Sequence, residues 1–171
     1  KSLGLAFHLS GRYDESLVAY SKASDLAPEW AGPVANSALV HLERGQLVLA
    51  YQYVMKSVKM DYKDPIPYSF LGFCYRELRM TEHANKAIDK SLALKPDYLL
   101  AQNYFAEFLL FIEKFEKAQT ILTKTIKQAP KNQFNHWINA QLHIQTGDLV
   151  LAKTSFEQIA QMGGRYRLPA K

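Results

Sequence analysis

Five histidines and one cysteine are the side chains that could bind a metal ion or act as a nucleophile. His136 and His143 are seven residues apart, so both could lie on one face of a helix. A metal site would also need a third ligand and a carboxylate that orients the histidines. His143 moreover occupies a position that is Phe7, Tyr75 or Leu109 elsewhere in the repeating pattern described below. We therefore expect histidines that pack in the structure and no metal site.

The single cysteine, Cys74, is a weak candidate for a catalytic thiol. Arg76 is close to it in sequence, but no histidine is near enough to act as its base. We expect a buried side chain that behaves as a small hydrophobe. The chain also has no glycine-rich phosphate loop and no Gly-x-Ser-x-Gly sequence. The sequence therefore predicts no catalytic residues, no cofactor and no enzymatic activity.

Composition places the chain among folded proteins. It has 171 residues, of which 48% are hydrophobic and 22% are charged, enough to bury a core. No run of about 18 apolar residues occurs, so we expect no membrane insertion. The net charge is +5, and the lysines around 114–131 are interrupted by acidic and apolar residues. This pattern favours a solvated helix surface over a surface that attracts an acidic partner or a polyanion such as a nucleic acid. One cysteine and no signal-peptide pattern favour a cytoplasmic location.

Apolar and small residues recur every 34 positions, which is the main organising feature of the chain. Two columns of equivalent positions hold small residues, and a third holds large apolar residues. A fourth column holds proline and a fifth holds glycine. These columns are Gly4, Ala38, Gly72, Ala106, Ala140; Ser16, Ala50, Ala84, Ala118, Ala152; Tyr20, Val54, Ile88, Leu122, Phe156; Pro28, Pro96, Pro130; and Gly11, Gly45, Gly147, with Arg79 and Lys114 replacing glycine in the third and fourth repeats.

Each column has a physical explanation. Spacings of three and four residues predict helices, and two helices of about 12 residues fit in each period. Small residues fall where the two helices approach closely, glycine ends the first helix and proline ends the second. We predict first helices at 2–10, 33–44, 66–78, 99–112 and 133–146, and second helices at 14–27, 48–61, 82–95, 116–128 and 150–162.

This pattern resembles the tetratricopeptide repeat (TPR) family. The third repeat is the closest copy, with Leu71-Gly72-Phe73-Cys74-Tyr75 followed by Ala84, Ile88, Ser91, Leu94 and Pro96. The resemblance implies an all-α, right-handed superhelical solenoid of about five helix-turn-helix repeats, the first of them truncated. We expect one TPR array over residues 1–166, with repeats at 1–30, 31–64, 65–98, 99–132 and 133–166, and a tail at 167–171. Departures from the family pattern are His41, Tyr62, Asn139 and His143.

The resemblance also implies that the first helices line a concave groove. Carried over column by column, its expected binding residues are mostly apolar or aromatic. For Phe73 and Phe111, groove exposure and packing between repeats stay open as alternatives, and packing is favoured for Leu110. The complete expected set is Leu39, Phe73, Arg76, Asn103, Glu107, Leu110, Phe111, Trp137 and Gln141.

Some family members clamp the C-terminal carboxylate of chaperones with Lys, Asn and Arg residues. Only Lys1 and Asn36 fit that pattern here, which disfavours a chaperone-tail clamp. The sequence instead favours a non-catalytic module that binds a peptide or helix of another protein in an apolar groove. The alternative is an assembly scaffold that self-associates as a homo-oligomer through uncapped ends, or that positions flanking domains.

Overall fold

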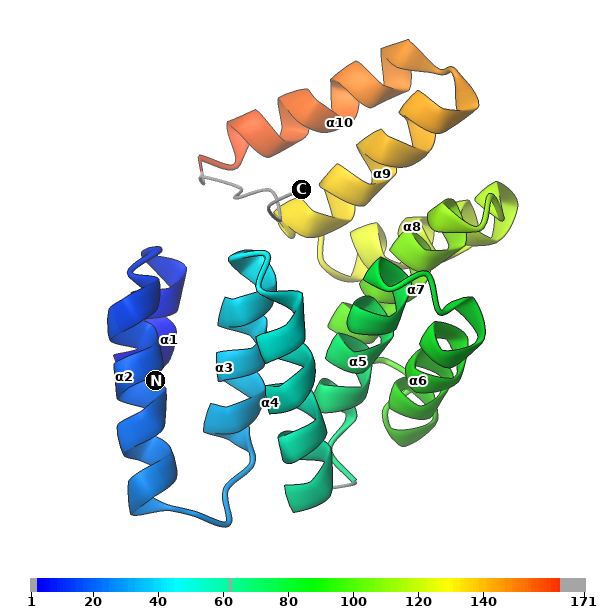
Figure 1. Cartoon of the computed structure of the whole chain (residues 1–171). Coiled ribbons are helices and arrows are strands. Elements are labelled where there is room, and N and C mark those ends of the chain that lie inside the picture. The colour runs from blue at the N-terminus through cyan, green and yellow to red at the C-terminus, as the bar shows by residue number, and fades with distance from the viewer. Residues whose placement is uncertain (1–2, 62, 164–171) are drawn as a thin grey trace. The chain divides into compact units, whose positions relative to one another are not determined.

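The computed structural model describes residues 3–61 and 63–163. Within these residues the chain forms ten α-helices and no strand, so the all-α expectation is confirmed (Figure 1). Both ends of every described helix lie within one residue of the predicted bounds. The helices are α1 (Leu3–Leu9), α2 (Tyr13–Leu26), α3 (Gly32–Glu43), α4 (Leu47–Met60), α5 (Pro65–Glu77), α6 (Thr81–Leu94), α7 (Leu99–Phe111), α8 (Phe115–Gln128), α9 (Gln133–Thr146) and α10 (Leu149–Gln161).

The turn inside each repeat contains one residue in the left-handed conformation. Gly11, Gly45 and Gly147 have φ angles of 73°, 70° and 84°, as expected for glycine at the end of a helix. Arg79 and Glu113 adopt the same conformation, with φ angles of 60° and 59°. The sequence predicted Lys114 at the turn of the fourth repeat. That prediction was wrong by one residue, because the left-handed residue there is Glu113. Lys114 lies just before α8 and has an ordinary φ of −92°.

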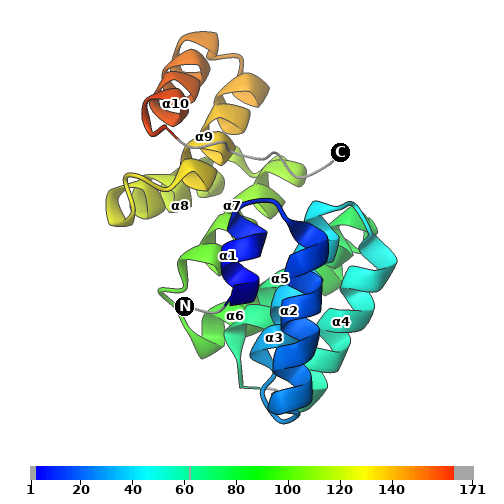
Figure 2. The same ribbon diagram turned by 90° about the vertical axis from the view of Figure 1, so that its left-hand side faces the viewer.

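The chain divides into two compact units, and each is described on its own. The first comprises α1–α6 and the second α7–α10. Within each unit, the two helices of a repeat pack against each other, and neighbouring repeats pack through their adjacent helices (Figures 1 and 2). The small columns lie at these helix contacts, as predicted. Ala38, Ala84, Ala106 and Ala140 are completely buried.

The core of each unit contains residues of the large apolar column and their neighbours, except for Phe156, which is 42% exposed. Val54, Ile88 and Leu122 are at most 1% exposed. Two polar residues that depart from the family pattern are accommodated by hydrogen bonds. The Nδ1 atom of His41 lies 2.7 Å from Oε1 of Gln46. The Nδ2 atom of Asn139 donates to Oγ of Ser155 at 3.0 Å.

The lengths and compositions of the helices also show whether one of them could span a membrane. None of the helices described here is both long enough and apolar enough to cross a bilayer.

Candidate functional site

In the first unit, three expected binding residues lie on α3 and α5, two first helices that pack together. The guanidinium of Arg76 lies 4.4 Å from the centroid of the Phe73 ring and also pairs with Oε1 of Glu77 at 2.7 Å. Only 11% of the Arg76 side chain is exposed, so its flat face is held on the ring. Leu39 is half-buried at the equivalent position on α3. We call Leu39, Phe73 and Arg76 the α3–α5 patch.

In the second unit, four expected residues are half-buried on the first helices α7 and α9. We call Glu107, Phe111, Trp137 and Gln141 the α7–α9 patch. The Trp137 ring stacks on Phe134, with centroids 6.1 Å apart and planes 19° apart. An indole supported in this way has little rotamer freedom left to lose on binding.

Sequence reasoning did not select two aromatic residues that support this patch. Phe134 meets Tyr104 edge-on, with ring centroids 5.7 Å apart. Tyr104 belongs to α7 and Phe134 to α9, so the pair links the two first helices of the unit. Phe134 lies at a first-helix position that the family resemblance assigns to the groove, and that position was the only signal available from the sequence.

Asn103 and Leu110 lie in the interior rather than on an exposed surface. Asn103 is 1% exposed, and its Nδ2 atom donates to Oδ1 of Asn135 at 2.5 Å. Leu110 is 4% exposed and belongs to the same hydrophobic cluster as Leu122 and Ile138. These two side chains therefore contribute to packing, which is the alternative that the sequence favoured for Leu110.

The side chains that could do chemistry are buried or bound within the fold. Burial raises the pKa of the Cys74 thiol to about 12, so it stays protonated near neutral pH. His136 is 4% exposed, and its Nε2 atom lies 2.8 Å from the Pro130 carbonyl. The described residues include no group of three His, Cys, Asp or Glu side chains able to hold a metal. Cys74 and His136 therefore have the packing roles expected of them.

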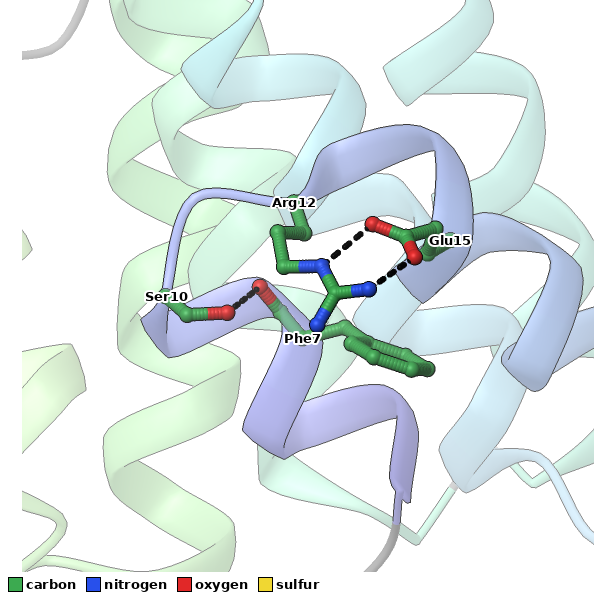
Figure 3. A network of polar contacts seen from close by, with 4 residues as sticks. All are labelled: Phe7, Ser10, Arg12 and Glu15. Carbon is green, nitrogen blue, oxygen red and sulfur yellow. Dashed lines mark hydrogen bonds and ion pairs between the residues drawn. The ribbon is translucent and has the colours of Figure 1, made fainter.

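A polar network surrounds the turn between α1 and α2 and stabilises the local structure. Arg12 stacks over Phe7 at 4.5 Å and pairs with both carboxylate oxygens of Glu15 (Figure 3). The Oγ atom of Ser10 donates to the Phe7 carbonyl at 2.9 Å. Because Arg12 and Glu15 are both about half exposed, solvent screens their ion pair. This network fastens the turn between α1 and α2.

Comparisons with known proteins rest on structure alone, since no family model and no curated protein matches this chain. The TPR protein TTC0263 of Thermus thermophilus superposes with a TM-score of 0.83 at 18% identity, over 94% of this chain and 88% of its own. A chain of the APC/C hetero-tetramer Cut9-Hcn1 gives 0.77 at 17% identity, over 93% of this chain. This chain spans about a third of that protein, 32% of its length. Pseudomonas aeruginosa pilF gives 0.68 at 21% identity, over 95% of this chain and 74% of its own.

The chain has the TPR fold. This conclusion follows from the high TM-scores over nearly the whole chain, together with the 34-residue columns. TPR proteins belong to the repeat architectures whose stacked units present extended surfaces for binding and assembly. The comparisons therefore establish the fold of this chain, and a fold of this kind defines neither a role nor a partner.

Proposed function

We propose that this protein is a non-catalytic interaction module that holds a peptide or helix of a partner protein against the exposed side of its first helices. The observation that carries the proposal is the Trp137–Phe134 stack in the α7–α9 patch. A half-buried tryptophan whose orientation is already fixed is the kind of anchor that dominates protein interfaces.

The polar members of the α7–α9 patch indicate how a bound segment would be oriented. Glu107 and Gln141 occupy equivalent positions on α7 and α9. Both are half-buried, and each lies on the same helix as an aromatic residue of the patch. A carboxylate and an amide among aromatic rings can accept or donate hydrogen bonds to a peptide backbone, while the rings contact its apolar side chains. We therefore expect an amphipathic helix or an apolar extended segment.

The α3–α5 patch has a similar composition in the first unit. Phe73 offers a ring whose one face is covered by Arg76, and Leu39 adds aliphatic surface. Arg76 is already paired with Glu77, so its charge is partly neutralised before any partner arrives. This combination favours an apolar side chain of the partner over an acidic one at this patch.

The test compares first-helix and second-helix aromatic residues. Trp137→Ala and the double variant Phe73→Asp/Phe111→Asp are used to capture partners from source extract, with mass-spectrometric readout. Phe156→Ala is the matched control, because Phe156 is 42% exposed on the second helix α10. Far-UV circular dichroism checks that each variant stays helical. The proposal predicts a partner that the wild type and Phe156→Ala retain and that the first-helix variants lose. A partner retained by all folded variants would contradict it.

A second candidate function, assembly of copies of this chain, is favoured by the surface of α10. Leu149, Val150 and Leu151 are 67%, 76% and 46% exposed, and with Phe156 they place apolar surface on one helix. This candidate predicts a molar mass that increases with concentration in light scattering. Val150→Asp should abolish that increase. A wild type that stays monomeric at high concentration would exclude self-association through α10.

A further inference from the structure

The second unit contains a pocket that lies outside both first-helix patches. Its volume is about 860 Å³, and it opens where the end of α8, the loop that follows, the start of α9 and the end of α10 meet. Figures 1 and 2 show α9 and α10 side by side and running in opposite directions, so the end of α10 returns to the start of α9. We propose that this pocket binds a short acidic segment of a partner protein.

Charge is the first argument. The sequence has no Asp or Glu between positions 117 and 147, while it has four lysines there: Lys117, Lys124, Lys127 and Lys131. Lys131 lines the pocket, and none of the described residues that line it is acidic. On the neighbouring helix, Glu157 is paired with Lys153 at 3.8 Å and does not line the pocket. The pocket therefore has a positive surrounding that favours a carboxylate.

The start of α9 adds to this attraction. The first N–H groups of a helix lack partners inside the helix and carry partial positive charge. Asn132 caps the N–H of Asn135 at 3.2 Å, and Asn132 and Gln133 both line the pocket. At the end of α10, the carbonyls of Gln158 and Ala160 already accept hydrogen bonds from Met162 and Gly163. Their opposing partial charge is thereby reduced.

His136 forms part of the buried wall of the pocket. It is 4% exposed and lines the pocket. Because the Pro130 carbonyl can only accept, the Nε2 atom of His136 donates to it, at 2.8 Å. The Nδ1 atom is buried and has no hydrogen-bond partner in the described part of the chain. Because this nitrogen has almost no accessible surface, His136 shapes the wall of the pocket and leaves the contacts with a ligand to Lys131 and the glutamines.

A peptide fits these groups better than a simple anion. The side-chain amides of Gln133, Gln158 and Gln161 both donate and accept, which matches a peptide backbone. Ile126 and Met162 provide apolar surface for a neighbouring side chain. Lys131 and the start of α9 then take the carboxylate.

The wall of the pocket is rigid before binding. Asn135 is completely buried and donates through Nδ2 to the Thr125 carbonyl at 2.8 Å. It also accepts from Nδ2 of Asn103 at 2.5 Å. These bonds attach the start of α9 to the end of α8 and to α7. The backbone of this wall therefore loses little conformational entropy when a segment binds.

The test measures fluorescence anisotropy of a labelled short peptide of alternating Glu and Leu added to the full chain. The matched probe has Gln in place of Glu. Lys131→Glu is the pocket variant, and Lys124→Glu is its control because it makes the same charge change at an exposed site outside the pocket. We expect the Glu peptide to bind about tenfold more tightly than the Gln peptide, and Lys131→Glu to weaken it about tenfold while Lys124→Glu changes it about twofold or less.

Three results would overturn the proposal. Equal losses in the two lysine variants would mean general attraction to a basic surface. Equal binding of the Glu and Gln peptides would mean that the carboxylate is not recognised. A loss in Trp137→Ala as large as that in Lys131→Glu would place the peptide on the α7–α9 patch instead.

Discussion

A methyl group placed on the Cα atom of Gly72 would lie 2.6 Å from Cγ1 of Ile88. Gly72 belongs to α5 and Ile88 to α6, so the two helices of the third repeat meet at the missing side chain. Gly4 makes the same close approach to Tyr20 in the first repeat, at 2.5 Å. In the second repeat the equivalent pair is Ala38 and Val54, both completely buried. In these three repeats glycine faces the larger partners, Tyr20 and Ile88, and alanine faces the smaller Val54.

Gly72→Ala is expected to destabilise the protein by about 1–3 kcal/mol, because the added methyl forces Ile88 or the helix backbone to move. The double variant Gly72→Ala/Ile88→Val recreates the pair found in the second repeat and should recover part of the loss. Urea unfolding followed by circular dichroism measures both. A Gly72→Ala protein as stable as the wild type would contradict the close approach.

Glu113→Gly is expected to stabilise the protein by about 0.5–1 kcal/mol. Glu113 has a φ of 59°, where a side chain is strained and glycine is not. Glu113→Ala is the control, since it removes the same carboxylate and keeps a Cβ atom. Thermal unfolding compares the three proteins. Equal stabilisation by both substitutions would show that the charge, and not the backbone conformation, is responsible.

Asn135→Ala is expected to destabilise the protein by about 2–3 kcal/mol. It removes the acceptor of Asn103 Nδ2 and the donor to the Thr125 carbonyl, and both of these groups are buried. Asn85→Ala is the control, because Asn85 bonds the exposed Asp89 within its own helix, and should cost about 0.5 kcal/mol or less. Similar urea midpoints for the two variants would argue against a structural role for the asparagine pair.

Cys74 is expected to resist thiol reagents in the native protein. Its side chain is completely buried, and its raised pKa leaves little thiolate. Reaction with an aromatic disulfide reagent should be slow in buffer and complete within minutes in concentrated guanidinium. A Cys74→Ala/Ser10→Cys protein, which carries its thiol at an exposed position, should react quickly in both conditions. Fast reaction of the folded wild type would disprove the burial of Cys74.

Stability is expected to fall as pH rises from about 9 to 12. Burial raises the pKa of Cys74 to about 12. A hydrogen bond with Tyr51, and then burial, raise the pKa of Tyr75 to about 12. Both pKa values lie above those of the unfolded chain, so in this window the folded state keeps protons that the unfolded state releases.

Urea unfolding at a series of pH values measures this dependence. The variant Cys74→Ala/Tyr75→Phe should show a smaller decline than the wild type. An identical decline in the two proteins would assign the effect to other groups.

The sequence by itself determined the helices and the repeat fold. The columns of Gly72, Ile88 and their equivalents recur every 34 residues because each repeat must pack the same two helices together, and this requirement is local. For the same reason the ends of the helices and the burial of Cys74 were predictable. The left-handed position of Glu113 was misplaced by one residue because only glycine marks such a position clearly in a sequence.

Tertiary structure alone decided which polar and aromatic residues face solvent. Asn103 and Glu107 are one helical turn apart, yet Asn103 is buried because Asn135, 32 residues away, meets it, while Glu107 is half-buried. The pocket likewise combines Lys131 and His136 with Gln158 and Gln161, which come together only because α10 returns along α9. Burial and pocket shape depend on contacts between helices, and no spacing within one helix specifies them.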